Sequence, residues 1–131
     1  KTDVGLLAGF VGFAVSLWLG LSIAMQALVV LMVADVVTGL LAGGKAGELD
    51  SDVSYRGMRK KAMQCVLVGL TTYLGALAPI NLPLGEGVAW AFCATEVLSV
   101  IENAARLGVT MPDPVVAALK RLGSTQQGGQ A

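Results

Sequence analysis

The stretch VGLLAGFVGFAVSLWLGLSIAMQALVVLMVA, residues 4–34, contains no charged residue. As one helix it would rise roughly 45 Å, whereas the hydrocarbon core of a bilayer is roughly 30 Å thick. We therefore expect a break at residues 20–22 that divides the stretch into two hydrophobic helices, at about 4–20 and 22–43. The paired glycines at 43–44 are expected to end the second helix, because adjacent glycines interrupt helices. This pattern predicts an integral membrane protein.

The composition of the whole chain agrees with that prediction. Its 131 residues are 55% hydrophobic and 14% charged, with a mean hydropathy of +0.73, whereas soluble domains carry about 25% charged residues. A soluble all-α domain is the alternative, but a domain of this size cannot bury so much apolar surface. The apolar stretch that follows Lys1 lacks a small-residue cleavage site, so we interpret it as a helix and not as a secretory signal.

A polar segment divides these two helices from the rest of the chain. Residues 44–59 carry many charges and predict a cytoplasmic loop. Two more hydrophobic helices and a short C-terminal amphipathic helix are expected at about 60–78, 86–107 and 113–122. The fold class is thus an all-α membrane protein with four hydrophobic helices, embedded as one domain over residues 1–122. Residues 123–131, rich in Ser, Gln and Gly, predict a disordered tail.

The basic residues predict the orientation in the membrane. If all four hydrophobic helices span, every Lys and Arg falls on the side that holds both termini, and the turns at 20–22 and 79–85 carry none. Because basic residues are retained in the cytoplasm, we expect both termini to be cytoplasmic. The residues expected to anchor this topology at the lipid headgroups are Arg56, Arg59, Lys60 and Lys61.

Several polar side chains lie inside the expected spans, where an ionised acid costs roughly 3 kcal/mol to insert. On the fourth helix they recur at spacings of three and four, which places them on one face. The candidate polar core or pore face consists of Asp35, Thr38, Glu96, Ser99, Glu102, Asn103 and Arg106. These residues either lock the second and fourth helices together by hydrogen bonds or line water in an assembled state, and the sequence leaves both interpretations open.

Small residues recur on the first helix at steps of three and four. Such a stripe permits close contact between membrane helices. On the first helix these residues are Gly5, Gly9, Gly12 and Ser16. Together with Gly39 of the second helix, they predict a helix-packing contact within a bundle or between copies. The chain has no His and no nucleophile–base pair, so we expect no catalytic residue, metal site or cofactor. A nucleic-acid partner is not expected either, because no basic patch is interleaved with aromatic residues.

Three sequence blocks resemble the pattern of a known family. DVVTG at 35–39 resembles the Asp-x-x-Thr-Gly signature of the toxin-secretion/phage-lysis holin family, and GMRKK at 57–61 resembles the block before its next span. EVLSVIEN at 96–103 resembles the Glu-x-x-Ser-x-x-Glu-Asn block of that family. The resemblance covers roughly residues 29–122.

The resemblance implies a bacteriophage-type holin. Such a protein forms homo-oligomers in the bacterial inner membrane and opens pores or lesions that release an endolysin, or a toxin, and cause host cell lysis. Its partners would be other copies, the lipid bilayer and an endolysin that it does not contact stably. The alternative is a small four-helix proton- or cation-coupled transporter or channel, which also carries acids within the membrane. A third class is a scaffold that anchors another membrane complex.

Overall fold

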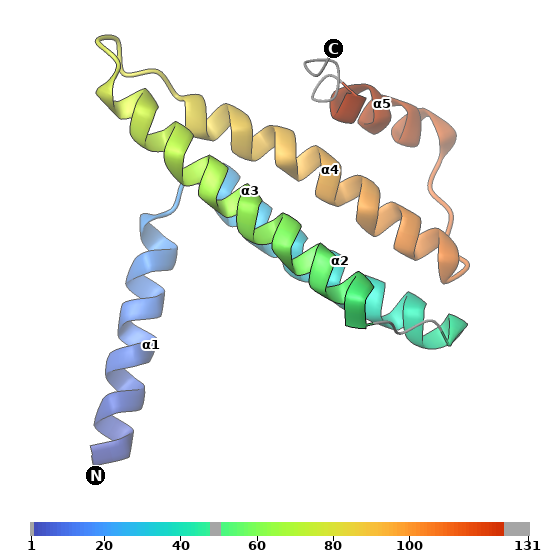
Figure 1. Ribbon diagram of the computed structural model, residues 1–131, viewed down its shortest axis with the longest axis horizontal. Coiled ribbons are helices and arrows are strands. Elements are labelled where there is room, and N and C mark those ends of the chain that lie inside the picture. Colours follow the sequence, from blue (N-terminus) through green and yellow to red (C-terminus); the bar gives the residue numbers. More distant parts are fainter. Residues whose placement is uncertain (1, 48–50, 125–131) are drawn as a thin grey trace.

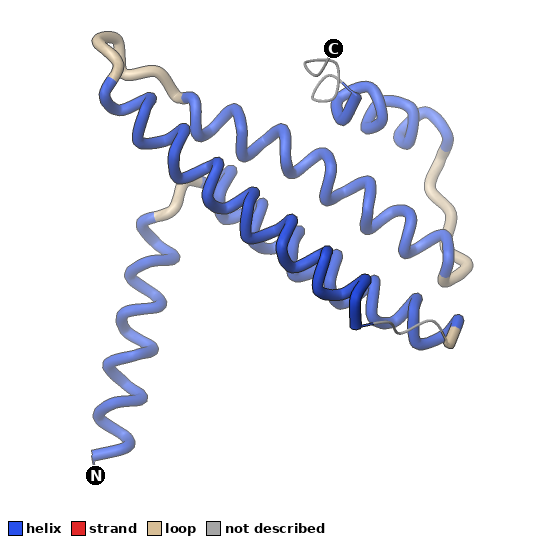
Figure 2. Tube along the Cα trace, viewed as in Figure 1, coloured by secondary structure: helices blue, strands red, loops and turns tan. Residues whose placement is uncertain are grey.

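The computed structural model describes residues 2–47 and 51–124, and these form five α-helices without a strand. The helices are α1 (Thr2–Gly20), α2 (Ile23–Ala46), α3 (Ser51–Leu77), α4 (Leu84–Arg106) and α5 (Asp113–Ser124). Helices α2, α3 and α4 run side by side as a bundle, while α1 points away from it (Figure 1). The described loops between helices are short (Figure 2). The all-helical class is therefore confirmed.

The polar segment between α2 and α3 differs from the loop expected at 44–59. Helix α2 continues through the paired glycines to Ala46, and Gly47, with a φ of 70°, ends it by donating its N–H to carbonyls of the last turn. Helix α3 already begins at Ser51. Charge does not prevent a helix: Asp52 lies in the first turn, where the helix dipole favours an acid. Residues 48–50 lie outside the described residues.

The C-terminal end also differs slightly from the prediction. Helix α5 extends to Ser124, so the first two residues of the expected tail belong to a helix. The remainder of that tail, residues 125–131, lies outside the described residues.

Within the described part of the chain, three helices are long and apolar enough to cross a membrane: α1, α2 and α4. Helix α3, expected as the fourth hydrophobic span, does not qualify. Its polar N-terminal half reaches Lys60 and Lys61, and Gln64 follows one turn later. The apolar part that remains, 65–77, is shorter than the roughly 20 residues that a span requires.

The bundle has a small apolar core between its three helices, and α4 contacts both α2 and α3. The buried core residues are Ala24, Leu28 and Met32 of α2, Val68 of α3, and Ala89 and Cys93 of α4. Large apolar side chains instead point outward; Val30, Leu70 and Trp90 are each at least half exposed. An apolar exterior around helices with satisfied backbones is what a lipid surrounding favours.

The connection between α3 and α4 is closely packed around two glycines. A Cβ added at Gly85 would lie 2.8 Å from Cα of Thr72, and one added at Gly75 would lie 2.2 Å from the carbonyl oxygen of Leu82. Backbone atoms cannot move aside as a flexible side chain can. This end of the bundle therefore requires glycine at both positions.

We expect Gly85→Ala to destabilise the bundle by about 1–3 kcal/mol, because overpacking forces backbone shifts. Gly87→Ala is the matched control, since a Cβ there would meet no atom within 4 Å. Thermal unfolding in detergent, followed by circular dichroism, measures the difference. Equal stability of the two variants would contradict the close α3–α4 packing.

Candidate functional site

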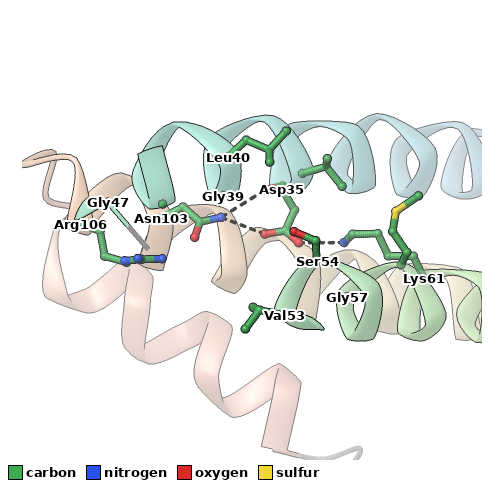
Figure 3. Close-up of a pocket in the computed structure, with 13 residues that line it drawn as sticks. Asp35, Gly39, Leu40, Gly47, Val53, Ser54, Gly57, Lys61, Asn103 and Arg106 are labelled. Carbon is green, nitrogen blue, oxygen red and sulfur yellow. Dashed lines mark hydrogen bonds and ion pairs between the residues drawn. The ribbon is translucent and has the colours of Figure 1, made fainter. Parts of the chain in front are cut away.

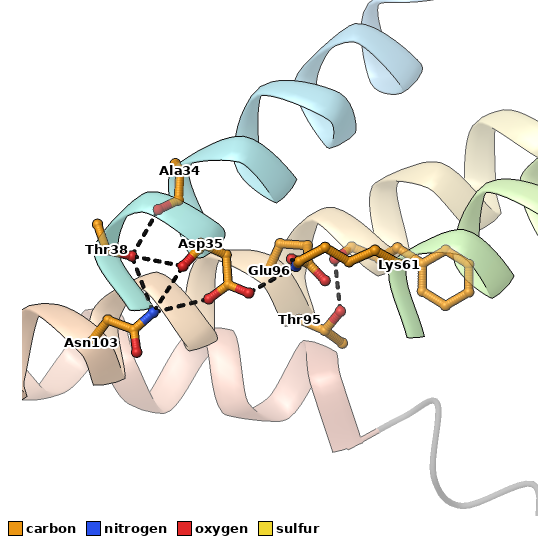
Figure 4. A network of polar contacts seen from close by, with 8 residues as sticks. Ala34, Asp35, Thr38, Lys61, Thr95, Glu96 and Asn103 are labelled. Atoms are coloured by element: carbon orange, nitrogen blue, oxygen red, sulfur yellow. Dashed lines mark hydrogen bonds and ion pairs between the residues drawn. The ribbon is translucent and has the colours of Figure 1, made fainter. Parts of the chain in front are cut away.

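A lysine of α3 lies between two acids from the neighbouring helices (Figure 4). The Lys61 ammonium donates a hydrogen bond to Asp35 Oδ2 of α2 at 2.7 Å and another to Glu96 Oε2 of α4. Glu96 is 1% exposed, and the side chains of Lys61 and Asp35 are 12% and 19% exposed. One cation is thus shared between two carboxylates inside the bundle, and we refer to these three residues as the ion cluster.

An amide extends the ion cluster toward the end of α4. The Asn103 side chain donates to Asp35 Oδ1 at 3.0 Å and to the Thr38 hydroxyl at 3.1 Å. That hydroxyl donates in turn to the carbonyl of Ala34 at 2.8 Å. Both oxygens of the Asp35 carboxylate therefore accept hydrogen bonds, one from each neighbouring helix. These hydrogen bonds and ion pairs link α2, α3 and α4 to one another, in addition to the apolar core.

The other polar residues expected on this face lie differently. Ser99 is half-buried, Glu102 is exposed, and Arg106 is exposed at the end of α4. Lys61 pairs with Asp35 and Glu96, and neither pair includes Glu102. The structure thus brings together four of the seven expected residues, Asp35, Thr38, Glu96 and Asn103.

The structure also assigns contacts to residues that the sequence reasoning placed elsewhere or did not select. From the sequence we expect Lys61 at the headgroups with Arg56, Arg59 and Lys60; those three are exposed, whereas Lys61 points into the bundle. The sequence contains an indication of this position of Lys61, because two acids inside apolar helices require a cation. Lys61 is the basic residue closest in sequence to the apolar part of α3.

Gln64 is a second polar residue of α3 that the sequence reasoning did not select. It lies one turn beyond Lys61 and is 3% exposed. Within the described residues, neither its amide nitrogen nor its amide oxygen has a hydrogen-bond partner. Such a group costs about 1–3 kcal/mol when it is left unsatisfied. The described arrangement therefore leaves one buried polar group without compensation.

A cavity of about 920 Å³ adjoins the ion cluster (Figure 3). It is lined by the last half of α2, the first half of α3 and the end of α4, and it reaches Asp35 and Lys61. Gly39 on α2 and Gly57 on α3 contribute to opposite walls. Polar groups of the ion cluster can thus be reached from one end of the bundle.

The small-residue stripe of α1 has no packing role within the described protomer. A Cβ added at Gly5, Gly9 or Gly12 would meet no atom within 4 Å, and Ser16 is exposed. At Gly39, by contrast, an added Cβ would lie 3.5 Å from the Asn103 amide nitrogen. Among the described residues, the α1 stripe therefore makes no close contact.

Among the described residues, no group of three or more His, Cys, Asp or Glu is arranged so that it could hold a metal ion. Cys65 is exposed and Cys93 is buried, and both are free thiols.

Comparison with known proteins gives one family and several relatives. The model of the bacteriophage holin family matches residues 12–124. An uncharacterized protein of Listeria monocytogenes is 32% identical over 88 residues, which cover 67% of this chain and 63% of that protein. An uncharacterized 14.9 kDa protein of Clostridium perfringens is 32% identical over 96 residues, 72% of this chain and 73% of that protein.

A phage protein is also similar. A protein named probable holin, from Bacillus phage phi105, is 28% identical over 85 residues, 65% of this chain and 63% of its own length. The match thus spans less than two thirds of the Listeria and phage relatives. No solved structure matches this chain.

We expect Lys61→Met to destabilise the protein by about 3–5 kcal/mol, because it leaves the buried Glu96 carboxylate and the half-buried Asp35 carboxylate without their cation. Lys60→Met is the matched control, since Lys60 is exposed. Adding Asp35→Asn and Glu96→Gln to the Lys61→Met variant should restore most of the stability. Denaturant unfolding in detergent micelles measures all three, and a Lys61→Met variant as stable as Lys60→Met would refute the shared ion pair.

Proposed function

The chain belongs to the bacteriophage holin family, and we propose that it acts as a holin in the bacterial inner membrane. It accumulates there, assembles as a homo-oligomer and opens lesions that let a peptidoglycan-degrading endolysin, or a toxin, leave the cell. The observation that carries this proposal is the ion cluster of Asp35, Lys61 and Glu96 inside a bundle with an apolar exterior. The family match over residues 12–124 supports the same role.

The ion cluster supports a closed state that can convert into a water-lined one. With the helices together, each charged group has a partner of opposite charge. Separating α3 from α2 and α4 exposes two carboxylates, an ammonium and the amide of Gln64. These groups are expensive in lipid, so the helices can separate only where water replaces the lost partners. Opening the bundle therefore favours a wetted lesion over exposure to acyl chains.

The unsatisfied amide of Gln64 adds to this preference. It has no partner in the described residues, and water would supply its hydrogen bonds without breaking any that it makes in the bundle. The closed protomer thus contains one residue whose environment improves on opening. The membrane potential can bias the same equilibrium, because moving one charge through 100 mV is worth about 2.3 kcal/mol.

The packing of α3 and the distribution of basic residues support a proposed orientation in the membrane. We infer that α3 crosses with α1, α2 and α4, because it packs along α4 and places its lysine against acids of both neighbours. Four crossings leave both termini on the side that holds every Lys and Arg residue other than Lys61, which lies within the bundle. Retention of basic residues then makes that side cytoplasmic.

A proton- or cation-coupled channel or transporter is the second candidate. The observation that favours it is the cavity of about 920 Å³ that reaches Asp35 and Lys61 from one end of the bundle. Purified protein in liposomes separates the two functions. A transporter gives saturable, gradient-driven flux of small solutes, whereas a holin releases large dyes.

We expect inducible expression of the chain together with an endolysin that has no secretion signal to lyse a bacterial host. Either protein expressed alone should leave the cells unlysed over the same period, because the enzyme remains separated from the cell wall. Culture turbidity and release of a cytoplasmic enzyme measure lysis. Intact cells after co-expression, with the chain present in the membrane fraction, would refute the holin role.

We expect Glu96→Gln to delay lysis in the same assay, because the opened face then carries one charge less and binds water less strongly. The Lys61–Asp35 pair remains, so membrane accumulation should be unchanged. Glu102→Gln is the matched control, an exposed acid on the same helix. Membrane protein level and lysis time are measured separately, and normal timing of Glu96→Gln would remove this acid from the mechanism.

A further inference from the structure

Helices α3 and α4 run antiparallel and keep one register along the bundle. Near their connection Thr72 lies against Gly85, and at the ion cluster Lys61 donates to Glu96. The two contacts are eleven residues apart on α3 and eleven residues apart on α4. Each residue of α3 between these contacts therefore has a defined neighbour on α4.

Polar groups extend from the cavity into the bundle as far as Gln64. The cavity opens at the end of the bundle where α4 ends, and it reaches Asp35 and Lys61 (Figure 3). Lys61 also binds the buried Glu96. Gln64 follows one turn later on the same face of α3, and its amide has no hydrogen-bond partner among the described residues. Water that enters the cavity can thus bind one polar group after another up to Gln64.

Beyond Gln64 the interior is apolar over a short distance. By the register of α3 and α4, Val68 faces Ala89, and both pack in one cluster with Ala24 of α2. These three residues are buried, and we refer to them as the apolar plug. Gln64 and Thr72, which precede and follow the plug on α3, are eight residues apart. That separation is about 12 Å, whereas the hydrocarbon core is roughly 30 Å thick.

The remaining core residues lie on the polar side of the plug. Cys93 faces Gln64 in the same register, and Leu28 and Met32 lie one and two turns beyond the plug residue of α2. They flank the polar groups of α3 and α4 and leave the apolar distance between Gln64 and Thr72 unchanged.

Polar groups are present again directly beyond the plug, at the α1–α2 corner. Ala24 is the second residue of α2 and adjoins this corner. There the Gln26 amide donates to the carbonyls of Trp18 at 3.0 Å and Leu21 at 3.3 Å, and the Ser22 hydroxyl caps α2. In the proposed four-crossing orientation, the corner lies on the outer side of the membrane and the cavity on the cytoplasmic side. The plug thus separates polar groups that belong to opposite sides.

We propose that the apolar plug is the gate of a path for water and small ions through a single copy. The path leads from the cavity past the ion cluster to the α1–α2 corner. A constriction of apolar side chains blocks ions by excluding water, and this one is a single layer thick. The inference rests on the proposed function and its membrane orientation, and it adds small-ion conduction by one protomer to the lesions formed between copies.

Val68→Asn tests the gate in liposomes that contain both potassium ions and a large fluorescent dye. It should raise potassium efflux roughly tenfold over the unsubstituted chain, because a polar side chain in the plug binds water that valine excludes. Val66→Asn is the matched control, since Val66 lies on the same helix and is 53% exposed. Potassium efflux no faster for Val68→Asn than for Val66→Asn would overturn the proposal.

Gln64→Leu should act in the opposite direction. It lengthens the apolar layer by one turn and removes a buried amide that has no partner among the described residues, so the bundle should retain its fold. Added to Val68→Asn, it should return potassium efflux to the level of the Val66→Asn control. Efflux that stays at the Val68→Asn level would show that the leak does not pass Gln64, which contradicts the proposed path. Circular dichroism in detergent checks the helix content of each variant.

The gate and the holin role fail separately, because potassium efflux reports the gate and dye release reports lesions. Dye release by the unsubstituted chain, with no effect of Val68→Asn on potassium, would keep the holin role and refute the gate. Potassium efflux from Val68→Asn without dye release by either protein would support the gate and refute the holin role. If Val68→Asn releases potassium and dye together, the lesions carry both, and the gate is refuted.

Discussion

The sharing of one ammonium between two carboxylates holds the three-helix bundle together at its polar end. Lys61 of α3 donates to Asp35 of α2 and to Glu96 of α4. In a lipid surrounding none of these groups is tolerated alone, because an unpaired charge at membrane depth costs several kcal/mol. The pairing therefore explains why α3, which is too polar to qualify as a span by itself, packs along the apolar α4. The helix supplies the cation that its neighbours need.

The bundle has two ends with different chemistry. Near the α1–α2 corner, small apolar residues such as Ala24 and Ala89 are fully buried, and the α3–α4 connection is closely packed around Gly85. Toward the other end lie the ion cluster, Asn103 and the cavity. Close packing is costly to undo, because a void beside a packed side chain offers it no other atoms to attract. The charged groups, by contrast, can be hydrated once they separate, so under the proposed function the polar end is the end at which the bundle would open.

Helix α1 and the cavity are two surfaces that the described residues of the protomer leave uncovered. Gly5 and Gly57 both lie in open space, although glycine within a helix costs roughly 0.5–1 kcal/mol relative to alanine. Among the described residues, no contact at either glycine offsets that cost. The exposed apolar faces of the other helices would meanwhile remain against lipid.

The sequence by itself determined the helical membrane class, the family and the presence of costly polar residues in apolar helices. These conclusions depend on local properties: an uncharged run such as 4–34 has few stable arrangements other than membrane helices. It also placed seven polar residues on one expected face, of which the structure brings together four, Asp35, Thr38, Glu96 and Asn103. Only the tertiary structure decided that Lys61 joins them and that Gln64 is buried, because which face of α3 turns inward depends on how it packs against α4. It likewise decided that residues 51–59 are helical and that α1 stands apart, since composition records the polarity of a segment but not the neighbours that fix its conformation.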